Sequence, residues 1–317
     1  MQSLRIAYAG TPAFAVPALE AIIHSPHELV AVLTQPDRKS GRGRKFSESA
    51  VKQSAKSSNV LILQPEKVND NEVLSQLLEL NIDLLVVAAY GQIFSQQLLD
   101  LPRLGCINIH ASLLPKWRGA SPIQHAILAG DRVSGVTIMQ MQLAMDAGDI
   151  WLQSECVISD EDTAQSLHDK LAALGGKTIL KAIKVVAQES NKPTPQDSSK
   201  ASYCSKLKKS DGLIVWSEPA QLILRKVRAF HPWPGAYTVF NGRRLRITKA
   251  LLCMEETTQK TLPGTITDIS KLGISVATGE NTLVICELVP EGGKCVSAVD
   301  FSNSNVLQNQ VLGEFVN

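Results

Sequence analysis

The sequence predicts an α/β protein. We expect the N-terminal part to form a Rossmann-like, open and mostly parallel sheet with helices on both faces, and the C-terminal part a smaller β-barrel of the OB-like type. The 317 residues exceed the length of one typical domain. In the first part, short apolar runs alternate with helix-like stretches, which is typical of a parallel sheet. The second part holds short strands joined by tight turns, which is typical of a small barrel.

The first part opens with a strand-like run at 4–9, and apolar residues at helical spacing follow at 14–24. A second helix is predicted at 71–80. Further strands are predicted where Val, Ile and Leu gather, at 29–33, 60–63, 84–88, 105–109 and 136–141. Parallel sheets bind ligands at the carboxyl ends of their strands, so one site is expected there. The residues expected around it are Gly10, Thr34, Tyr90, Asn108 and His110.

A long helix is predicted at 163–187, because apolar residues recur along one stripe of it and Asp162 or Thr163 can cap its start. The residues that follow are polar and include two prolines, so they have little to bury and are interpreted as a linker. The predicted organisation is a domain at 1–188, a linker at 189–205 and a second domain at 206–317.

The second part begins with helical spacing at 218–230. Asn241-Gly242 is a strong hairpin-turn signal between two of its short strands. The strands are predicted at 236–240, 243–250, 264–269, 274–277 and 282–288.

Composition narrows the class of protein. Hydrophobic residues make up 44% and charged residues 20% of the chain, as in ordinary globular proteins. There is no run of about 18 apolar residues and no signal-peptide pattern, so no membrane partner is expected. The six cysteines are scattered without Cys-x-x-Cys spacing. Their scattered positions argue against a metal site or a disulfide framework. They favour a reducing cytoplasm as the location of the protein.

Positive charge is unevenly distributed. The formal net charge is +2, but residues 200–249 hold eleven Lys and Arg against two acidic residues. A loop at 38–45 carries five more positive charges beside the expected site. Either block alone could be a solvated face, whereas two blocks favour a polyanionic partner. On the predicted hairpin, alternation places Arg244 and Arg246 on one face as phosphate contacts, whereas Trp233 and Tyr237 are expected to pack.

The stretch from 105 to 119 carries the most chemistry. Asn108 and His110 are two residues apart on a predicted strand, so both side chains face the same way. Side by side, an amide and an imidazole can bind one carbonyl oxygen and then its oxyanion. Asp146 follows the next predicted strand and adds a carboxylate, which suits acyl-group chemistry. An isolated Asn-x-His pair would more often have a structural role. Here the loop that follows contains Pro and Gly, which favours a functional site.

These residues form a long motif, Asn-x-His-x-Ser-Leu-Leu-Pro-x-x-Arg-Gly at 108–119 followed by Asp-x-Gly-Asp at 146–149. The motif resembles the 10-formyltetrahydrofolate-dependent formyltransferase family. Within that family the chain is most similar to the enzymes that act on methionyl-tRNA. The segments that carry this similarity are 6–15, 35–43, 88–93 and 228–236.

The resemblance implies transfer of a formyl group from 10-formyltetrahydrofolate to the α-amino group of initiator methionyl-tRNA. It places the catalytic residues at Asn108, His110 and Asp146. It implies that the folate contacts are Ser112, Leu113, Leu114, Pro115, Ala89 and Tyr90. For the tRNA, the expected contacts are Arg38, Lys39, Arg42, Arg44, Lys45, Lys206, Lys208, Arg244 and Arg246. A monomer that needs no metal is expected.

The chemistry also follows from the residues. Attack of an amine on a formyl carbon produces a tetrahedral oxyanion. Asn108 and protonated His110 can each donate a hydrogen bond to it. Asp146 can hold the imidazole and can accept the proton of the attacking amine. His110 or a relayed water can protonate the departing folate nitrogen.

Other functions stay open or are disfavoured. A formyltransferase for an amino-sugar nucleotide would share the three residues but has less use for two basic blocks. A formyl-folate hydrolase would not need the charged loop. A purine-pathway formyltransferase would leave the second domain unexplained. A tRNA-binding module without catalysis would not need the three residues. The absence of Gly-x-Gly-x-x-Gly and of a P-loop argues against nicotinamide and P-loop enzymes.

Overall fold

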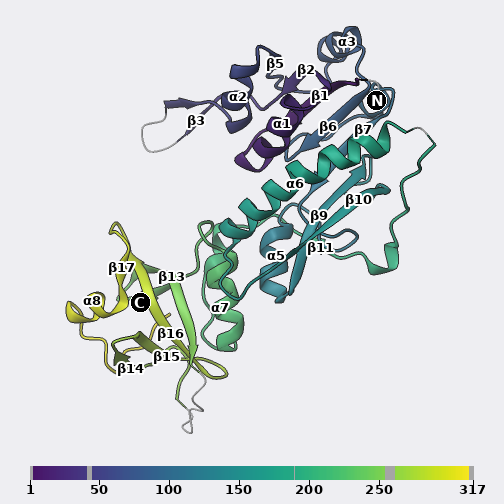
Figure 1. The fold of residues 1–317 in the computed structure, drawn as a ribbon. Coiled ribbons are helices and arrows are strands. Elements are labelled where there is room, and N and C mark those ends of the chain that lie inside the picture. The colour runs from purple at the N-terminus through teal and green to yellow at the C-terminus, as the bar shows by residue number, and fades with distance from the viewer. Residues whose placement is uncertain (1–2, 41–44, 189, 254–260, 314–317) are drawn as a thin grey trace. The chain divides into compact units, whose positions relative to one another are not determined.

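The computed structural model describes residues 3–40, 45–188, 190–253 and 261–313, and the side chains of residues 39, 40 and 45 are not described. The chain divides into two compact units (Figure 1). The first unit comprises Met1–Pro122, Val133–Val157 and His168–Cys204. The second comprises Ile123–Arg132, Ile158–Leu167 and Ser205–Asn317. The predicted boundaries at 188 and 205 stay a prediction.

The first unit is built on a seven-stranded sheet in the order β10-β9-β7-β6-β1-β2-β5. Its strands are β1 (Arg5–Gly10), β2 (Glu28–Leu33), β5 (Leu61–Leu63), β6 (Leu84–Ala88), β7 (Cys106–His110), β9 (Val133–Gln140) and β10 (Ile150–Val157). The first five are parallel, whereas β9 runs antiparallel to both of its neighbours, β7 and β10. The mostly parallel sheet is therefore confirmed. The strand β10 was not predicted because its half-exposed, alternating residues lack an apolar run.

Helices cover both faces of this sheet, as predicted. Helices α3 (Asn71–Glu79) and α4 (Gln96–Leu99) share a buried cluster with strand residues such as Ala7 and Leu85. The opposite face meets α6 (Ala164–Val186), because a Cβ on Gly175 would lie 3.2 Å from Ile109 Cγ2. Pleat alternation then puts Asn108 and His110 on the face away from α6.

The remaining elements that precede residue 220 are short. They are α1 (Val16–Ile23), α2 (Ala50–Ala55), β3 (Arg38–Ser40), β4 (Lys45–Ser47), β8 (Arg118–Gly119), β11 (Tyr203–Cys204) and α5 (Pro122–Ala129). Short 3-10 turns lie at Ala13–Ala15, Lys56–Ser58, Ser198–Lys200 and Lys209–Gly212. The predicted start of α6 is confirmed, because Thr163 Oγ1 accepts the Ser166 amide at 3.2 Å as a capping residue does.

The second unit contains an antiparallel sheet in the order β12-β13-β16-β15-β14, with β17 paired to β16. Its elements are α7 (Ala220–Ala229), β12 (Tyr237–Phe240), β13 (Arg243–Cys253), β14 (Ile266–Ser270), β15 (Gly273–Ala277), β16 (Thr282–Pro290), β17 (Val296–Ser297) and α8 (Ala298–Asn303). The five predicted strands and the helix are confirmed. Asn241 and Gly242 have φ values of 49° and 71°, as the predicted hairpin turn requires.

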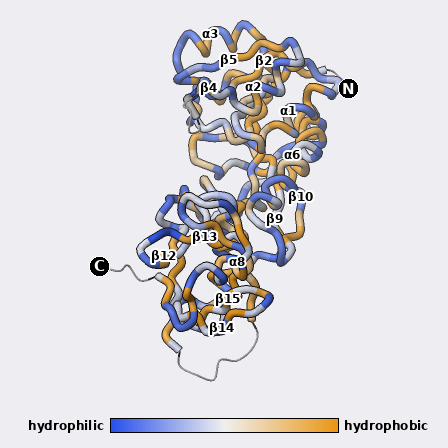
Figure 2. Tube along the Cα trace, turned by 90° about the vertical axis from the view of Figure 1, so that its left-hand side faces the viewer, coloured by the Kyte–Doolittle hydropathy of each residue, from blue (hydrophilic) through white to orange (hydrophobic). Residues whose placement is uncertain are grey.

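Alternating side chains build the core of this unit. Along β13, Leu245 and Ile247 are buried and Arg244 is exposed. Figure 2 shows the strands changing between hydrophobic and hydrophilic colours along their length. The buried residues of the strands join Ile223 and Val227 of α7 in one apolar cluster. Among the described residues, no helix is long and apolar enough to cross a membrane.

Candidate active site

The residues expected around one site follow the carboxyl ends of neighbouring parallel strands. Gly10 ends β1 and His110 ends β7, while Thr34 and Tyr90 lie just beyond β2 and β6. The loops after these strands are hydrogen-bonded to one another. Thr11 Oγ1 donates to the Tyr90 carbonyl oxygen at 3.0 Å. The predicted gathering of these strand ends at one edge of the sheet is confirmed.

His110 is hydrogen-bonded through one ring nitrogen and faces Asp146 with the other. Its Nε2 lies 2.9 Å from the carbonyl oxygen of Trp117. Because a carbonyl only accepts hydrogen bonds, Nε2 carries a proton in this contact. Nδ1 lies 3.6 Å from Asp146 Oδ1, and the two side chains are 7% and 12% exposed. That separation is longer than a hydrogen bond, so Nδ1 is the ring nitrogen that can bind a ligand.

Asp146 is held in an uncommon backbone conformation, with φ at 50°. Its Oδ2 accepts the Gly119 amide at 2.9 Å. Its own carbonyl oxygen accepts Nε2 of Gln196 at 3.0 Å. The neighbouring Gly148 leaves no room for a side chain, because a Cβ would lie 1.7 Å from the Gln140 carbonyl oxygen. The carboxylate is therefore aimed at His110 by a tightly packed loop.

Asn108 lies in the middle of the sheet. Its strand neighbours are Val87 on β6 and Met139 on β9. The side chain is half-buried, and its position two residues before His110 places both on the same face of β7. The structure thus brings the amide, the imidazole and the carboxylate into one region of the first unit.

The loop after His110 is rigidly built. Ser112 Oγ donates to the Lys116 carbonyl oxygen at 2.6 Å, and the Leu114-Pro115 peptide is cis. Thr137 Oγ1 donates to the Ser112 carbonyl oxygen at 2.7 Å and accepts the Leu114 amide at 3.0 Å. The Ser112 and Leu114 side chains are buried, whereas Leu113 and Pro115 are half-buried. Of these four residues, Leu113 and Pro115 therefore offer side-chain surface to a folate.

The second predicted folate segment lies after β6. Ala89 is exposed with φ at 47°. Tyr90 is 2% exposed and packs edge-on against Phe94 at a centroid distance of 5.9 Å. Burial raises the pKa of the Tyr90 phenol to about 12. Within the described part of the chain, its hydroxyl has no hydrogen-bond partner. Tyr90 therefore packs in the wall of the site while Ala89 faces outward.

The two ends of the basic loop, at 38–40 and 45–47, form short strands. Strands β3 and β4 pair antiparallel, which the sequence did not predict. Arg38 is exposed on β3, while Arg42 and Arg44 lie outside the described residues, as do the side chains of Lys39 and Lys45. At its base, Lys52 Nζ lies 2.6 Å from Asp37 Oδ2. This hydrogen bond lowers the pKa of the Asp37 carboxyl.

The basic residues of the second unit have differing environments. Lys206 and Lys208 are exposed. The Arg244 guanidinium lies 3.6 Å from the centre of the Tyr237 ring. Arg246 is half-buried, and its Nε has no hydrogen-bond partner among the described residues. Trp233 is 48% exposed, which contradicts the expectation that its side chain packs in the core.

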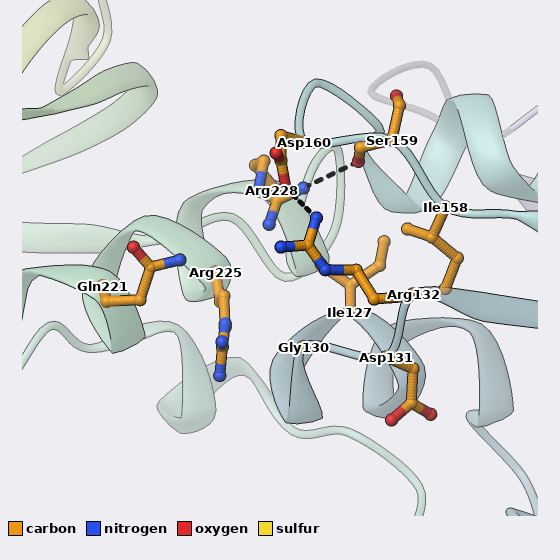
Figure 3. A pocket seen from close by; sticks show the side chains of 10 residues that line it. All are labelled: Ile127, Gly130, Asp131, Arg132, Ile158, Ser159, Asp160, Gln221, Arg225 and Arg228. Atoms are coloured by element: carbon orange, nitrogen blue, oxygen red, sulfur yellow. Dashed lines mark hydrogen bonds and ion pairs between the residues drawn. The ribbon is translucent and has the colours of Figure 1, made fainter.

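A cavity of about 60 Å³ in the second unit is lined by three arginines (Figure 3). Arg225 and Arg228 stand one turn apart on α7, a spacing that the sequence analysis passed over. Arg228 Nη1 donates to the Ser159 carbonyl oxygen at 3.2 Å. Arg132 Nη1 lies 3.5 Å from Asp160 Oδ1. With these partners inside the unit, we interpret the cluster as structural.

Sequence reasoning missed the residues that support the site. Arg118 is 5% exposed, and its guanidinium contacts Gln196. Ser202 Oγ accepts the Trp117 amide at 3.0 Å. Gln196 and Ser202 fall in the segment interpreted as a linker. Composition gave no signal for them, because isolated polar residues among prolines show no periodicity.

Comparison with known proteins shows the family of the chain. Residues 4–183 match the formyl transferase family, and residues 206–306 match the formyl transferase C-terminal domain. The methionyl-tRNA formyltransferase of Coxiella burnetii is 46% identical over 303 residues, which are 96% of this chain and 96% of that protein. That of Hydrogenovibrio crunogenus is 45% identical over 98% of this chain and 99% of that protein.

Solved structures share the fold at lower identity. The N-formyltransferase from Helicobacter canadensis, in complex with folinic acid and dTDP-3-aminofucose, is 19% identical with a TM-score of 0.64, covering 89% of this chain and 98% of that chain. HypX from Aquifex aeolicus in complex with tetrahydrofolic acid is 15% identical with a TM-score of 0.62. This chain aligns over 98% of its own length and spans 49% of HypX. Since the two curated relatives are at least 45% identical to it over almost their whole length, the chain belongs to the methionyl-tRNA formyltransferase family.

Proposed function

We propose that the protein transfers the formyl group of 10-formyltetrahydrofolate to the α-amino group of methionyl-initiator-tRNA, giving N-formylmethionyl-tRNA for translation initiation. The observation that carries this proposal is the pairing of His110, at the carboxyl end of β7, with Asp146 of the loop between β9 and β10: His110 Nδ1 lies 3.6 Å from Asp146 Oδ1, and Asn108 lies on the same face of β7 as His110. The near full-length similarity to methionyl-tRNA formyltransferases supports the choice of acceptor.

The transfer step uses these three side chains. The amine attacks the formyl carbon, a C–N bond forms, and the carbonyl oxygen becomes an oxyanion. Asn108 and His110 Nδ1 donate hydrogen bonds to that oxyanion, since the Trp117 carbonyl occupies Nε2. Asp146 accepts the proton that the amine loses. The bond from carbon to the folate nitrogen then breaks, and that nitrogen receives a proton from His110 or a relayed water.

The two substrates are assigned to different surfaces. Residues 1–188 form the catalytic domain, residues 189–205 the linker, and residues 206–317 the tRNA-binding domain. Leu113, Pro115 and the main chain at Ala89 contact the folate, while Ser112, Leu114 and Tyr90 shape its site from within. The tRNA contacts are Arg38, Lys39, Arg42, Arg44, Lys45, Lys206, Lys208, Arg244 and Arg246. The protein acts as a monomer in the cytoplasm.

Formyl transfer to charged initiator methionyl-tRNA tests this proposal, with 10-formyltetrahydrofolate as the donor. Wild-type protein is compared with His110→Ala, Arg42→Ala and the control Lys177→Ala, which removes an exposed charge on α6. We expect turnover by wild type and control, none by His110→Ala, and partial recovery of Arg42→Ala at high tRNA concentration. If wild type consumes the folate donor and leaves the tRNA unmodified, the proposed acceptor is wrong.

A further inference from the structure

We propose that Gln196 is a positioning residue of this transferase, acting through the main chain of Asp146. The inference rests on the proposed function, because it assigns a role within the same site. Gln196 does not contact His110 in the described structure. It binds the loop that carries Asp146 on one side and the guanidinium of Arg118 on the other.

The Gln196 amide makes four hydrogen bonds. Its Nε2 donates to the carbonyl oxygens of Asp146 and Gly148, at 3.0 and 2.6 Å. Its Oε1 accepts from Nε and Nη2 of Arg118, at 3.1 and 2.8 Å. A primary amide has two donor hydrogens and two acceptor lone pairs, so every hydrogen-bonding position of this side chain is used. A glutamine that only covered a surface would leave some of these positions to water.

The hydrogen bonds from Gln196 stabilise an uncommon backbone conformation. Asp146 has a φ of 50°, a conformation that residues other than glycine seldom adopt. The bond from Gln196 to the Asp146 carbonyl fixes the peptide that follows this residue. On the other side of Asp146, the Gly119 amide holds the carboxylate at 2.9 Å. Gly119 follows Arg118 directly, so Gln196 joins the two elements that orient the carboxylate.

The chain around Gln196 is itself anchored to the first unit. Thr194 exchanges two main-chain hydrogen bonds with Ile150, both 2.8 Å long. Ser202 accepts the Trp117 amide through Oγ at 3.0 Å and the Arg118 amide through its carbonyl oxygen at 2.8 Å. The Trp117 carbonyl in turn receives His110 Nε2. This one segment therefore supports both residues of the imidazole–carboxylate pair.

Two substitutions at Gln196 remove either one side of the amide's contacts or both sides. Gln196→Glu keeps an acceptor for the Arg118 guanidinium but replaces the donors to Asp146 and Gly148 with an oxygen that repels their carbonyls. Gln196→Met keeps the length of the side chain and removes all four hydrogen bonds. The control Gln76→Glu adds the same charge at an exposed position on α3. Each variant is compared with wild type in kcat, KM and Tm.

We expect both Gln196 variants to lower kcat by about 10- to 100-fold, as the loss of supporting residues around ligands does in other sites. KM for methionyl-tRNA and for the folate donor should change by less than about threefold, because Gln196 supports the transition state and does not bind either substrate. In an Asp146→Asn background, Gln196→Glu should add little further loss, because both changes disable one unit. A Gln196→Glu variant with wild-type kcat, or fully additive losses, would overturn the inference.

One readout does not depend on turnover. The Gly119 amide proton is hydrogen-bonded to a carboxylate, so its NMR resonance reports the position of Asp146. We expect this resonance to move in Gln196→Glu and to stay unchanged in Gln76→Glu. An unmoved resonance in a folded Gln196→Glu protein contradicts the positioning role. Failure of wild type to formylate methionyl-tRNA would contradict the proposed function instead, and the resonance would still test Gln196.

Discussion

The site depends on individual side chains whose geometry the neighbouring backbone sets. His110 Nε2 is committed to the Trp117 carbonyl, which leaves Nδ1 and Asn108 to face a reacting carbonyl. Donors fixed in advance in this way need little rearrangement when charge develops on the oxygen. Asp146 completes the set from a loop whose conformation glycine at position 148 makes possible.

Asn108→Ala tests the oxyanion role. Removing one such donor typically lowers the rate by about 10²–10³-fold, so we expect a loss of at least this size. Rapid-quench measurement of a single turnover with methionyl-tRNA checks it, since product release does not then mask the chemical step. A loss below about tenfold would contradict the assignment of Asn108. Unchanged Tm in the variant would exclude unfolding as the cause.

At the scale of elements, the parallel strands β1, β2, β6 and β7 bring separate loops to one edge of the sheet. The hairpin formed by β3 and β4 leaves this edge directly after β2. Its base is tied to α2 by Lys52, which contacts Asp37, while Gln64 Nε2 donates to Asp37 Oδ1 at 2.8 Å. Asp37, at the base of this hairpin, therefore connects the basic hairpin to α2.

Lys52→Met tests this anchor. The hydrogen bond from Lys52 lowers the pKa of Asp37, so its loss should move that pKa back up toward 3.8. A carboxyl with a lowered folded-state pKa contributes stability above its unfolded pKa and loses it as the pH falls through the folded value. We therefore expect the pH-dependent contribution of Asp37 to stability to shrink in the variant, because its folded and unfolded pKa values become similar. An NMR titration of Asp37 measures it, and an unchanged pKa would contradict the anchor.

At the scale of the whole molecule, the proposed function assigns different roles to the two units. The first unit holds Asn108, His110 and Asp146, and the second holds the basic residues of β13, which are Arg243, Arg244, Arg246 and Lys249. On β13, alternation buries Leu245 and Ile247 and turns Arg244 outward onto Tyr237. A long anion is the partner that fits charge distributed over separate elements.

The salt dependence of tRNA binding tests this division. Contacts to phosphates release counterions, so KM for methionyl-tRNA should rise steeply with salt concentration. Arg244→Gln should raise this KM and reduce the slope of log KM against log salt by about one. The same change should leave KM for the folate donor unaltered. Equal slopes for wild type and variant would remove Arg244 from the tRNA contacts.

Regular elements were predictable because burial imposes a pattern on the sequence. The strand at 84–88 is buried on both faces and reads as an apolar run, and α6 shows a helical stripe. Strand β10 and the hairpin of β3 and β4 escaped prediction because their residues are half-exposed or charged. A local sequence pattern does not reveal strand pairing among exposed residues. Exposed side chains permit a strand but do not require one.

By itself, the sequence determined the fold class and predicted the three residues to which we assign the reaction. Apolar periodicity reports which face is buried, and a long motif keeps its residues in a fixed order along the chain. The tertiary structure alone decided how those residues are oriented. The contacts of Gln196 with Asp146 and of Ser202 with Trp117 join positions 50 and 85 residues apart. Such contacts depend on hydrogen-bond geometry between distant segments, which leaves no periodic trace in either segment.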